Sequence, residues 1–253
     1  MFLIKNKFRM KKNVFFSLFM LLSISVLSAQ IVVLNPVKVE QEDIKQFLDI
    51  EMNYSKKIAQ NAVNNNKLVG WALLQNINLG PDDYNFIWVN IYPDIETAAN
   101  NKAWWNNSEE VLGLKPDILF SNSSKYKFDR SYTYKMEMSI PNTGPAAYVL
   151  LNFATPDDVD VVSKEMKKYV VPHFKKKMNE NGMVGWGMAT KITPQGEDYS
   201  SLMFYDSYDS LANVMKHLAG ESVIKGLPMD KLSKFNWEMR PIMKVISSTT
   251  AKK

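Results

Sequence analysis

The spacing of apolar residues changes along the chain and predicts alternating strands and helices. Apolar and β-branched residues run together over 31–39, then recur at three- and four-residue steps over 42–66 with charged residues between them. The first pattern is typical of a strand and the second of an amphipathic helix. Strands at 68–77 and 84–92, a helix at 94–105 and a strand at 130–140 follow. The predicted order is β-α-β-β-α-β.

The second half of the chain returns to the same order. We expect strands at 147–153, 184–192, 199–206 and 237–246. Helices are expected from Asp158 to 181 and over 208–219. The run Thr155-Pro156-Asp157-Asp158 supplies a capping residue, a proline and acidic residues, which favour the start of a helix.

A direct repeat relates the two halves. Residues 69–98 and 184–213 align without a gap at an offset of 115, so Val-Gly-Trp matches Val-Gly-Trp and Asp83-Tyr84 matches Asp198-Tyr199. A repeat of this length indicates a duplicated supersecondary unit. We therefore predict two ferredoxin-like βαββαβ repeats at 30–140 and 146–246, joined by a linker at 141–145 and followed by a frayed polar tail at 247–253.

In such a repeat both helices cover one face of the sheet, so two sheets in one chain can cover each other's bare faces. On this topology and repeat, the chain resembles the dimeric α/β-barrel superfamily in its fused form, with both subunits in one chain. The resemblance covers nearly all of 31–246 and includes no catalytic motif. It implies an α+β fold with the two sheets packed as an intramolecular barrel. The protein would be a monomer with an internal pseudo-dimer, or a homodimer of such chains.

The first 29 residues have the layout of a secretory signal peptide. Five Lys and Arg residues precede an apolar core at 14–27, which ends in Leu27-Ser28-Ala29 and is short for a membrane span. We expect cleavage after this segment and export to the periplasm or the exterior, with no membrane attachment afterwards. An uncleaved N-terminal anchor is the alternative interpretation.

Removal of this segment also changes the charge of the chain. Without its five basic residues, the formal charge of +5 falls to zero, with 26 Lys and Arg against 26 Asp and Glu. A neutral protein has no global electrostatic attraction to nucleic acid, so nucleic-acid binding is disfavoured. The chain has no cysteine, which excludes thiol catalysis, thiolate metal sites and disulfides. The sequence predicts no metal site, since neither histidine has a second ligand at metal-site spacing.

Alternation along the strands separates their two faces and suggests which residues bind a ligand. Purely apolar faces suit packing under helices, whereas faces that mix aromatic and hydrogen-bonding groups suit a pocket. Gly70 and Gly185 allow close approach on one side, and a helix is the simplest neighbour there. This assignment predicts six residues lining the barrel interior: Trp71, Trp88, Tyr92, Trp186, Met203 and Tyr205. The alternative is that these side chains are simply core.

Few residues can carry catalysis. The only histidines are His173 and His217, and Arg130 and Arg240 are the only arginines after the signal segment. His173, His217 and Arg240 are therefore the weak catalytic candidates, although each could equally be a satisfied structural residue. No phosphate-binding glycine loop or nucleophile elbow is present.

Two functions follow from these observations. The first is an exported protein that binds a small apolar or aromatic molecule between its two sheets, with no cofactor. The alternative, which the resemblance implies, is a monooxygenase-type or haem-handling enzyme. In that case His173 or His217 would be the axial ligand or the base, and Arg240 would face the distal side. A third interpretation, a partner-binding module, would use Trp104 and Trp105.

Overall fold

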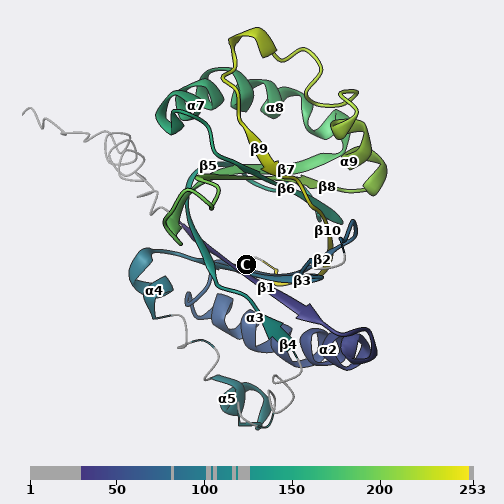
Figure 1. The fold of residues 1–253 in the computed structure, drawn as a ribbon. Helices are drawn as coiled ribbons and strands as arrows, with labels where there is room; N and C mark the ends of the chain where they lie inside the picture. The colour runs from purple at the N-terminus through teal and green to yellow at the C-terminus, as the bar shows by residue number, and fades with distance from the viewer. Residues whose placement is uncertain are drawn as a thin grey trace, which may run out of the picture.

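The computed structural model describes residues 30–80, 83–100, 104, 107–115, 118 and 126–250. The expected signal segment, Trp105 and residues 251–253 lie outside these ranges. The architecture is α+β: a closed antiparallel β-barrel lies between two layers of helices (Figure 1).

The first half builds one wall of the barrel. Its strands β1 (Ile31–Val39), β2 (Gly70–Asn76), β3 (Phe86–Tyr92) and β5 (Tyr132–Ile140) pair in the order β2-β3-β1-β5. The short strand β4 (Tyr126–Phe128) pairs with β1. Helices α2 (Ile44–Ile50) and α3 (Lys56–Asn64) lie below this wall in Figure 1, with the shorter α4 (Ile95–Ala99) and α5 (Ser108–Leu112).

The second half builds the opposite wall. Strands β6 (Tyr148–Ala154), β7 (Met183–Thr193) and β8 (Leu202–Tyr208) pair in the order β7-β8-β6. The closing strand is divided into β9 (Trp237–Met239) and β10 (Ile242–Ser248), and both parts pair with β6. Helices α7 (Val159–Glu165), α8 (Val171–Lys177) and α9 (Leu211–Leu218) cover the outside of this wall.

Pairings between the halves close the barrel. Strand β5 pairs with β7, and β10 pairs with β2. The sequence predicted a frayed tail from Ser247 onward, but residues 247–250 are held by pairing and hydrogen bonds, so the prediction is wrong for them. Ser248 lies opposite Ala72, and the Thr249 amide donates to the carbonyl of Trp71. The closing strand reaches this far because the backbone of β2 would otherwise lack a partner.

Three apolar layers fill the molecule. One packs between the first wall and its helices, with Phe47 and Ile58 fully buried in it. A second packs between the second wall and its helices, around Phe174. The third fills the barrel interior and includes Leu74 and Met203.

The internal repeat extends beyond the aligned segment. A single π-helical turn interrupts the long helix of the first half at Glu51–Ser55 and that of the second half at Met166–Val170. Both turns keep the offset of 115. Such turns insert one extra residue into an α-helix and often lie at functional sites.

The offset changes by one residue before the third strand of each half. Trp71 lies opposite Asn90 across β2 and β3, whereas Trp186 lies opposite Asp206 across β7 and β8. The equivalent of Asn90 is therefore Asp206, at an offset of 116. The second half has one more residue between Tyr199 and its strand. The ungapped alignment missed this residue, and a one-residue slip exchanges the two faces of a strand.

The predicted interior lining is wrong for four of its six residues. Trp71, Trp88 and Tyr92 pack under the helices of the first half, and Trp186 packs under those of the second. The glycine face of β7 points into the barrel, where a Cβ on Gly187 would lie 2.2 Å from the ring of Tyr205. An aromatic ring, and not a helix, requires that glycine. Met203 and Tyr205 do face the interior, as predicted.

Candidate functional site

A cavity of about 160 Å³ lies beneath the helices of the second half. We call it the helix-side pocket. Its walls are largely apolar, and four polar residues come together in its lining: Asn152, Asp206, His217 and Arg240. The apolar lining residues are Met166, Val170, Phe174, Trp186, Phe204, Ile224, Leu227, Met229, Leu232, Phe235 and Trp237.

Strand alternation brings the polar groups to one face of the sheet. Asp206 follows Phe204 by two residues on β8, so both side chains point toward the helices. Asn152 lies on β6 and is paired with Phe204 across the sheet. His217 comes from α9, and Arg240 occupies the break between β9 and β10.

A chain of hydrogen bonds connects these groups. The Arg240 Nε donates to Asn152 Oδ1 at 2.6 Å, and Asn152 Nδ2 donates to Asp206 Oδ2 at 2.6 Å. One terminal nitrogen of Arg240 lies 3.4 Å from His217 Nε2, and His217 Nδ1 lies 2.6 Å from the Tyr208 hydroxyl. Asp206 Oδ2 is 3.8 Å from His217 Nε2.

These contacts assign the state of His217. A guanidinium carries only donors, so the Nε2 atom that faces Arg240 acts as the acceptor and the proton resides on Nδ1. His217 is then neutral. Burial lowers its pKa, and the charge of Arg240 acts in the same direction, against the opposing effect of Asp206.

Burial also shifts the pKa values of Asp206 and Arg240. It raises the pKa of the Asp206 carboxyl above its ordinary value, although His217, Asn152 and Arg240 all act to lower it. It lowers the pKa of Arg240, but an arginine stays protonated in proteins. The pocket therefore combines a fixed cation, a neutral imidazole and a buried carboxyl, the kind of perturbed cluster that marks candidate functional sites.

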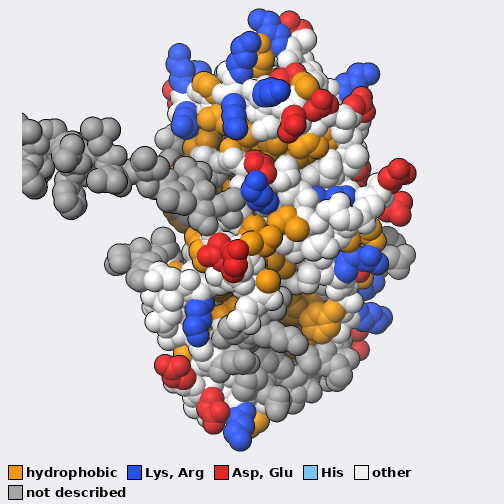
Figure 2. Space-filling model, turned by 90° about the vertical axis from the view of Figure 1, so that its left-hand side faces the viewer, with side chains coloured by type: hydrophobic (Ala, Val, Ile, Leu, Met, Phe, Trp, Pro, Cys, Tyr) orange, Lys and Arg blue, Asp and Glu red, His pale blue; other side chains and the backbone are white. Residues whose placement is uncertain are grey.

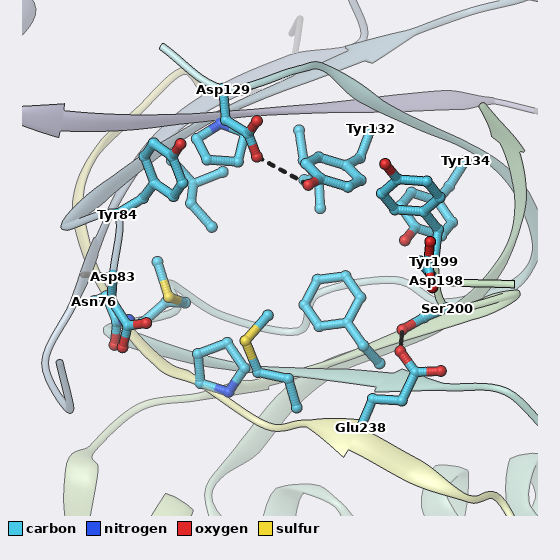
Figure 3. A pocket seen from close by; sticks show the side chains of 17 residues that line it. Asn76, Asp83, Tyr84, Asp129, Tyr132, Tyr134, Asp198, Tyr199, Ser200 and Glu238 are labelled. Carbon is cyan, nitrogen blue, oxygen red and sulfur yellow. Dashed lines mark hydrogen bonds between the residues drawn. The ribbon is translucent and has the colours of Figure 1, made fainter. Parts of the chain in front are cut away.

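A second cavity, of about 300 Å³, lies between the two walls of the barrel. We call it the inter-sheet pocket. Figure 3 shows Tyr84 and Asp83 on one side of it and Tyr132, Tyr134 and Tyr199 on the other. The remaining lining residues are Leu34, Pro36, Asn76, Ile87, Asp129, Phe153, Asp198, Ser200, Glu238, Met239, Pro241 and Met243.

Figure 2 shows Lys and Arg side chains interspersed with Asp and Glu on the face in view. Within the described part of the chain, no helix combines the length and apolar composition needed to cross a bilayer. Nor does any group of three or more His, Asp or Glu side chains among these residues form a metal site.

The structure separates the sequence candidates. His217 and Arg240 meet in the helix-side pocket, whose wall includes Trp186. His173 lies on α8 outside this lining, and its Nε2 is 2.7 Å from the carbonyl oxygen of Val223. Trp104 is buried and its indole donates to the Tyr92 hydroxyl, so it belongs to the core of the first half.

Sequence reasoning missed Asp206, Asn152 and the whole acidic lining of the inter-sheet pocket. Asp206 carried a usable signal, because an acid in the middle of the strand sequence LMFYDSY is unusual for a buried strand. Asn152 carried none, since its role depends on partners 54 and 88 residues away.

Comparisons with known proteins identify the fold. No protein-family model and no curated protein sequence matches the chain. Among solved structures, a candidate monooxygenase from Fusobacterium nucleatum is similar in fold. The superposition covers 89% of this chain and 99% of the monooxygenase chain, with a TM-score of 0.57 and 10% sequence identity. For a second candidate monooxygenase, from Lactobacillus acidophilus, the superposition covers 89% of this chain and 98% of the other, with a TM-score of 0.54 and 12% sequence identity.

A haem-binding protein from Thermus thermophilus also matches. It covers 87% of this chain and 92% of its own, with a TM-score of 0.51 and 11% identity. Chlorite dismutases are among the other matched structures. At these identities the likeness concerns the fold alone. These structures have the dimeric α/β-barrel fold, and the chain shares it.

Proposed function

We propose that the helix-side pocket binds a single-ring aromatic molecule, or one of similar size, with an anionic or hydrogen-bond-accepting group directed at Arg240 and His217. The observation that carries this proposal is the 3.4 Å contact of these two residues within a largely apolar lining. The size also fits, because an apolar cavity of about 150 Å³ holds benzene in another protein. The sequence predicted a small apolar or aromatic ligand between the sheets; this proposal keeps the aromatic ring, adds an anionic or accepting group, and places the ligand beneath the helices.

Arg240 can supply the contact that orients such a ligand. A guanidinium has five N–H donors. Its Nε donates to Asn152 and one terminal nitrogen faces His217, so further donors remain for a carboxylate or phenolate. Trp237 lies against the guanidinium with its ring centroid 5.0 Å from Cζ, which holds the side chain in place.

The second candidate function is proton transfer of the monooxygenase type. It is favoured by the neutral His217, whose Nε2 lone pair is the acceptor. A ligand group that takes over the Arg240 donor would free Nε2, and the imidazole could then accept a proton from that ligand while Tyr208 and Asp206 stabilise the imidazolium. Structural neighbours assigned as monooxygenases agree with this chemistry.

Haem does not fit the residues present. An axial histidine needs an imidazole nitrogen free to face the iron. The Nε2 atom of His217 faces a guanidinium, and that of His173 faces the carbonyl of Val223. A cavity of about 160 Å³ is also of single-ring size, far below a haem macrocycle.

Arg240→Met is expected to lower the affinity for benzoate at least tenfold, because the buried ligand charge loses its partner. Titration calorimetry with benzoate measures this, and the fluorescence of Trp186 and Trp237, both in the lining, reports the same event. Arg130→Met is the matched control, since Arg130 is exposed and lies outside this lining. Equal affinities in the wild type and Arg240→Met would contradict the proposal.

His217 separates binding from catalysis. His217→Gln should keep benzoate affinity within roughly threefold, because Arg240 remains, but should abolish turnover if His217 is the base. His173→Ala is the control. If both variants leave binding and activity unchanged, the enzymatic alternative fails.

We also propose that the protein acts after export, as two tandem ferredoxin-like repeats in one chain. The N-terminal segment supports export through its basic residues, apolar core and Leu27-Ser28-Ala29 end. N-terminal sequencing of protein recovered from an exporting host should begin at Gln30. A sequence that still begins at residue 1 or at Met10 would contradict cleavage.

A further inference from the structure

The inter-sheet pocket is a second cavity that the proposed function leaves unused. Strands β6 and β9 form a common wall between the two pockets. Asn152 and Trp237 line the helix-side pocket, whereas the next residues, Phe153 and Glu238, line the inter-sheet pocket. Alternation along a strand keeps the two sites on opposite faces. Their chemistry is different as well.

The repeated Asp-Tyr pair lies at this pocket. Asp83-Tyr84 and Asp198-Tyr199 follow the second strands of their halves and come to opposite sides of the cavity (Figure 3). Asp129 and Glu238 add two further carboxylates. The described lining residues include no Lys, Arg or His. The internal duplication thus concentrates acidic and aromatic groups at one opening of the barrel.

Two cations contact the Tyr199 side of the pocket and offset only part of this charge. Arg130 lies over the Tyr199 ring, 5.1 Å from its centroid, donates to the Tyr199 hydroxyl and approaches Asp129 to 3.8 Å. Lys191 donates to the carbonyls of Gly196 and Tyr199. These two cations therefore offset at most half of the four carboxylate charges in the lining. Glu238 accepts hydrogen bonds only from the hydroxyls of Thr155 and Ser200 among the described residues.

Tyr134 supplies an independent sign of a ligand. Its side chain is 1% exposed and lines the cavity, and the described residues offer its hydroxyl no hydrogen-bond partner. The hydroxyl is not among the fully enclosed polar atoms that lack a partner, so it remains accessible to a ligand in the cavity. The neighbouring Tyr132 differs, since its hydroxyl donates to Asp129 at 2.9 Å. Phe153 lies 6.3 Å from the Tyr134 ring and extends the aromatic wall.

We propose that the inter-sheet pocket binds a small organic ammonium ion with an apolar or aromatic body. Aromatic faces attract cations through the ring quadrupole, and the surrounding carboxylates add Coulomb attraction. The Tyr134 hydroxyl accepts a hydrogen bond from the ammonium group. A cavity of about 300 Å³ has room for one ring with an aminomethyl group.

The test compares benzylamine, which is a cation at pH 7, with benzyl alcohol, its neutral counterpart, by titration calorimetry on the full protein. Benzylamine should bind at least tenfold more tightly, and its affinity should fall as salt is raised. The double variant Asp129→Asn/Glu238→Gln should lower that affinity about tenfold. Tyr134→Phe should lower it severalfold without a change in the pocket's shape.

Asp160→Asn/Glu180→Gln is the matched control, because it removes the same charge from two exposed residues outside this lining. Equal binding of benzyl alcohol, or an equal loss in this control, would overturn the proposal. Loss of benzylamine binding in Arg240→Met would do so as well, since it would place the amine in the helix-side pocket. Benzoate binding in the double variant should be unchanged, so the two sites can fail independently.

Discussion

Glu51→Gln is expected to make the protein about 3 kcal/mol more stable than the wild type at pH 8 and to leave its stability unchanged at pH 4. Glu51 is 2% exposed and lies in the π-helical turn of the first half. Its Oε2 accepts a hydrogen bond from the indole of Trp88 at 2.8 Å, and no described cation pairs with it. Burial without a counter-charge raises its pKa from 4.5 to about 7.

The sign of the effect follows from this rise. In the unfolded chain Glu51 ionises near pH 4.5, whereas in the folded protein it keeps its proton until about pH 7. Its contribution to stability is complete below pH 4.5 and is lost as the pH rises through 7. Glutamine resembles the protonated acid and does not titrate, so the variant avoids this loss.

Urea denaturation between pH 4 and 8 measures the difference directly. Glu51→Met, which introduces the residue found at the equivalent Met166, should remove the same pH dependence. Glu180→Gln, at an exposed position, should change stability by no more than about 0.5 kcal/mol at any pH. A constant difference between Glu51→Gln and the wild type across this range would show that Glu51 does not titrate in this way.

Asp206→Ala is expected to destabilise the protein by about 3 kcal/mol at pH 7. Asp206 is buried and accepts a hydrogen bond from the side-chain amide of Asn152, which is itself 1% exposed. Its removal leaves that amide without its 2.6 Å partner and deprives Arg240 of the nearest carboxyl. Thermal or urea unfolding monitored by circular dichroism provides the measurement.

The corresponding position in the first half provides a matched control for this variant. Asn90 occupies the equivalent position in the first half and is 5% exposed, but its Oδ1 has no hydrogen-bond partner in the described structure. Asn90→Ala should therefore cost only about 1 kcal/mol, mainly for the small cavity. Equal losses in the two variants would mean that the Asp206 network contributes nothing beyond packing.

The chemistry of the two pockets depended on register that the sequence concealed. The offset of 115 correctly relates Trp71 to Trp186 but fails for Asn90, whose equivalent is Asp206. The extra residue lies between Tyr199 and β8, in a connection where local patterning is weak. Because strands alternate every residue, this single position concealed that Trp88 and Tyr92 face the helices. Trp71 and Trp186 were misplaced for another reason, the assumption that a helix lies over the strand glycines.

Other features were readable from the sequence alone. Period-two and period-3.6 patterns depend only on neighbouring residues, so they predicted the order of strands and helices, including the strand Ile31–Val39 as observed. The aligned segments led us to predict a duplicated unit, which stays a prediction, and the scarcity of His and Arg limited the candidates to a few positions. His217 and Arg240 were among these, although nothing in their spacing showed that they would meet.

Tertiary structure decided which groups meet and what state they are in. Closure of the barrel joins β10 to β2 across more than 160 residues and aligns Arg240 with Asn152 and His217. It also gathers two distant Asp-Tyr pairs around one cavity and buries Glu51 without a counter-charge. Local sequence determines the secondary structure because its forces act between neighbouring residues. The sites depend on desolvation and contacts between residues far apart in the chain, which only the closed barrel creates.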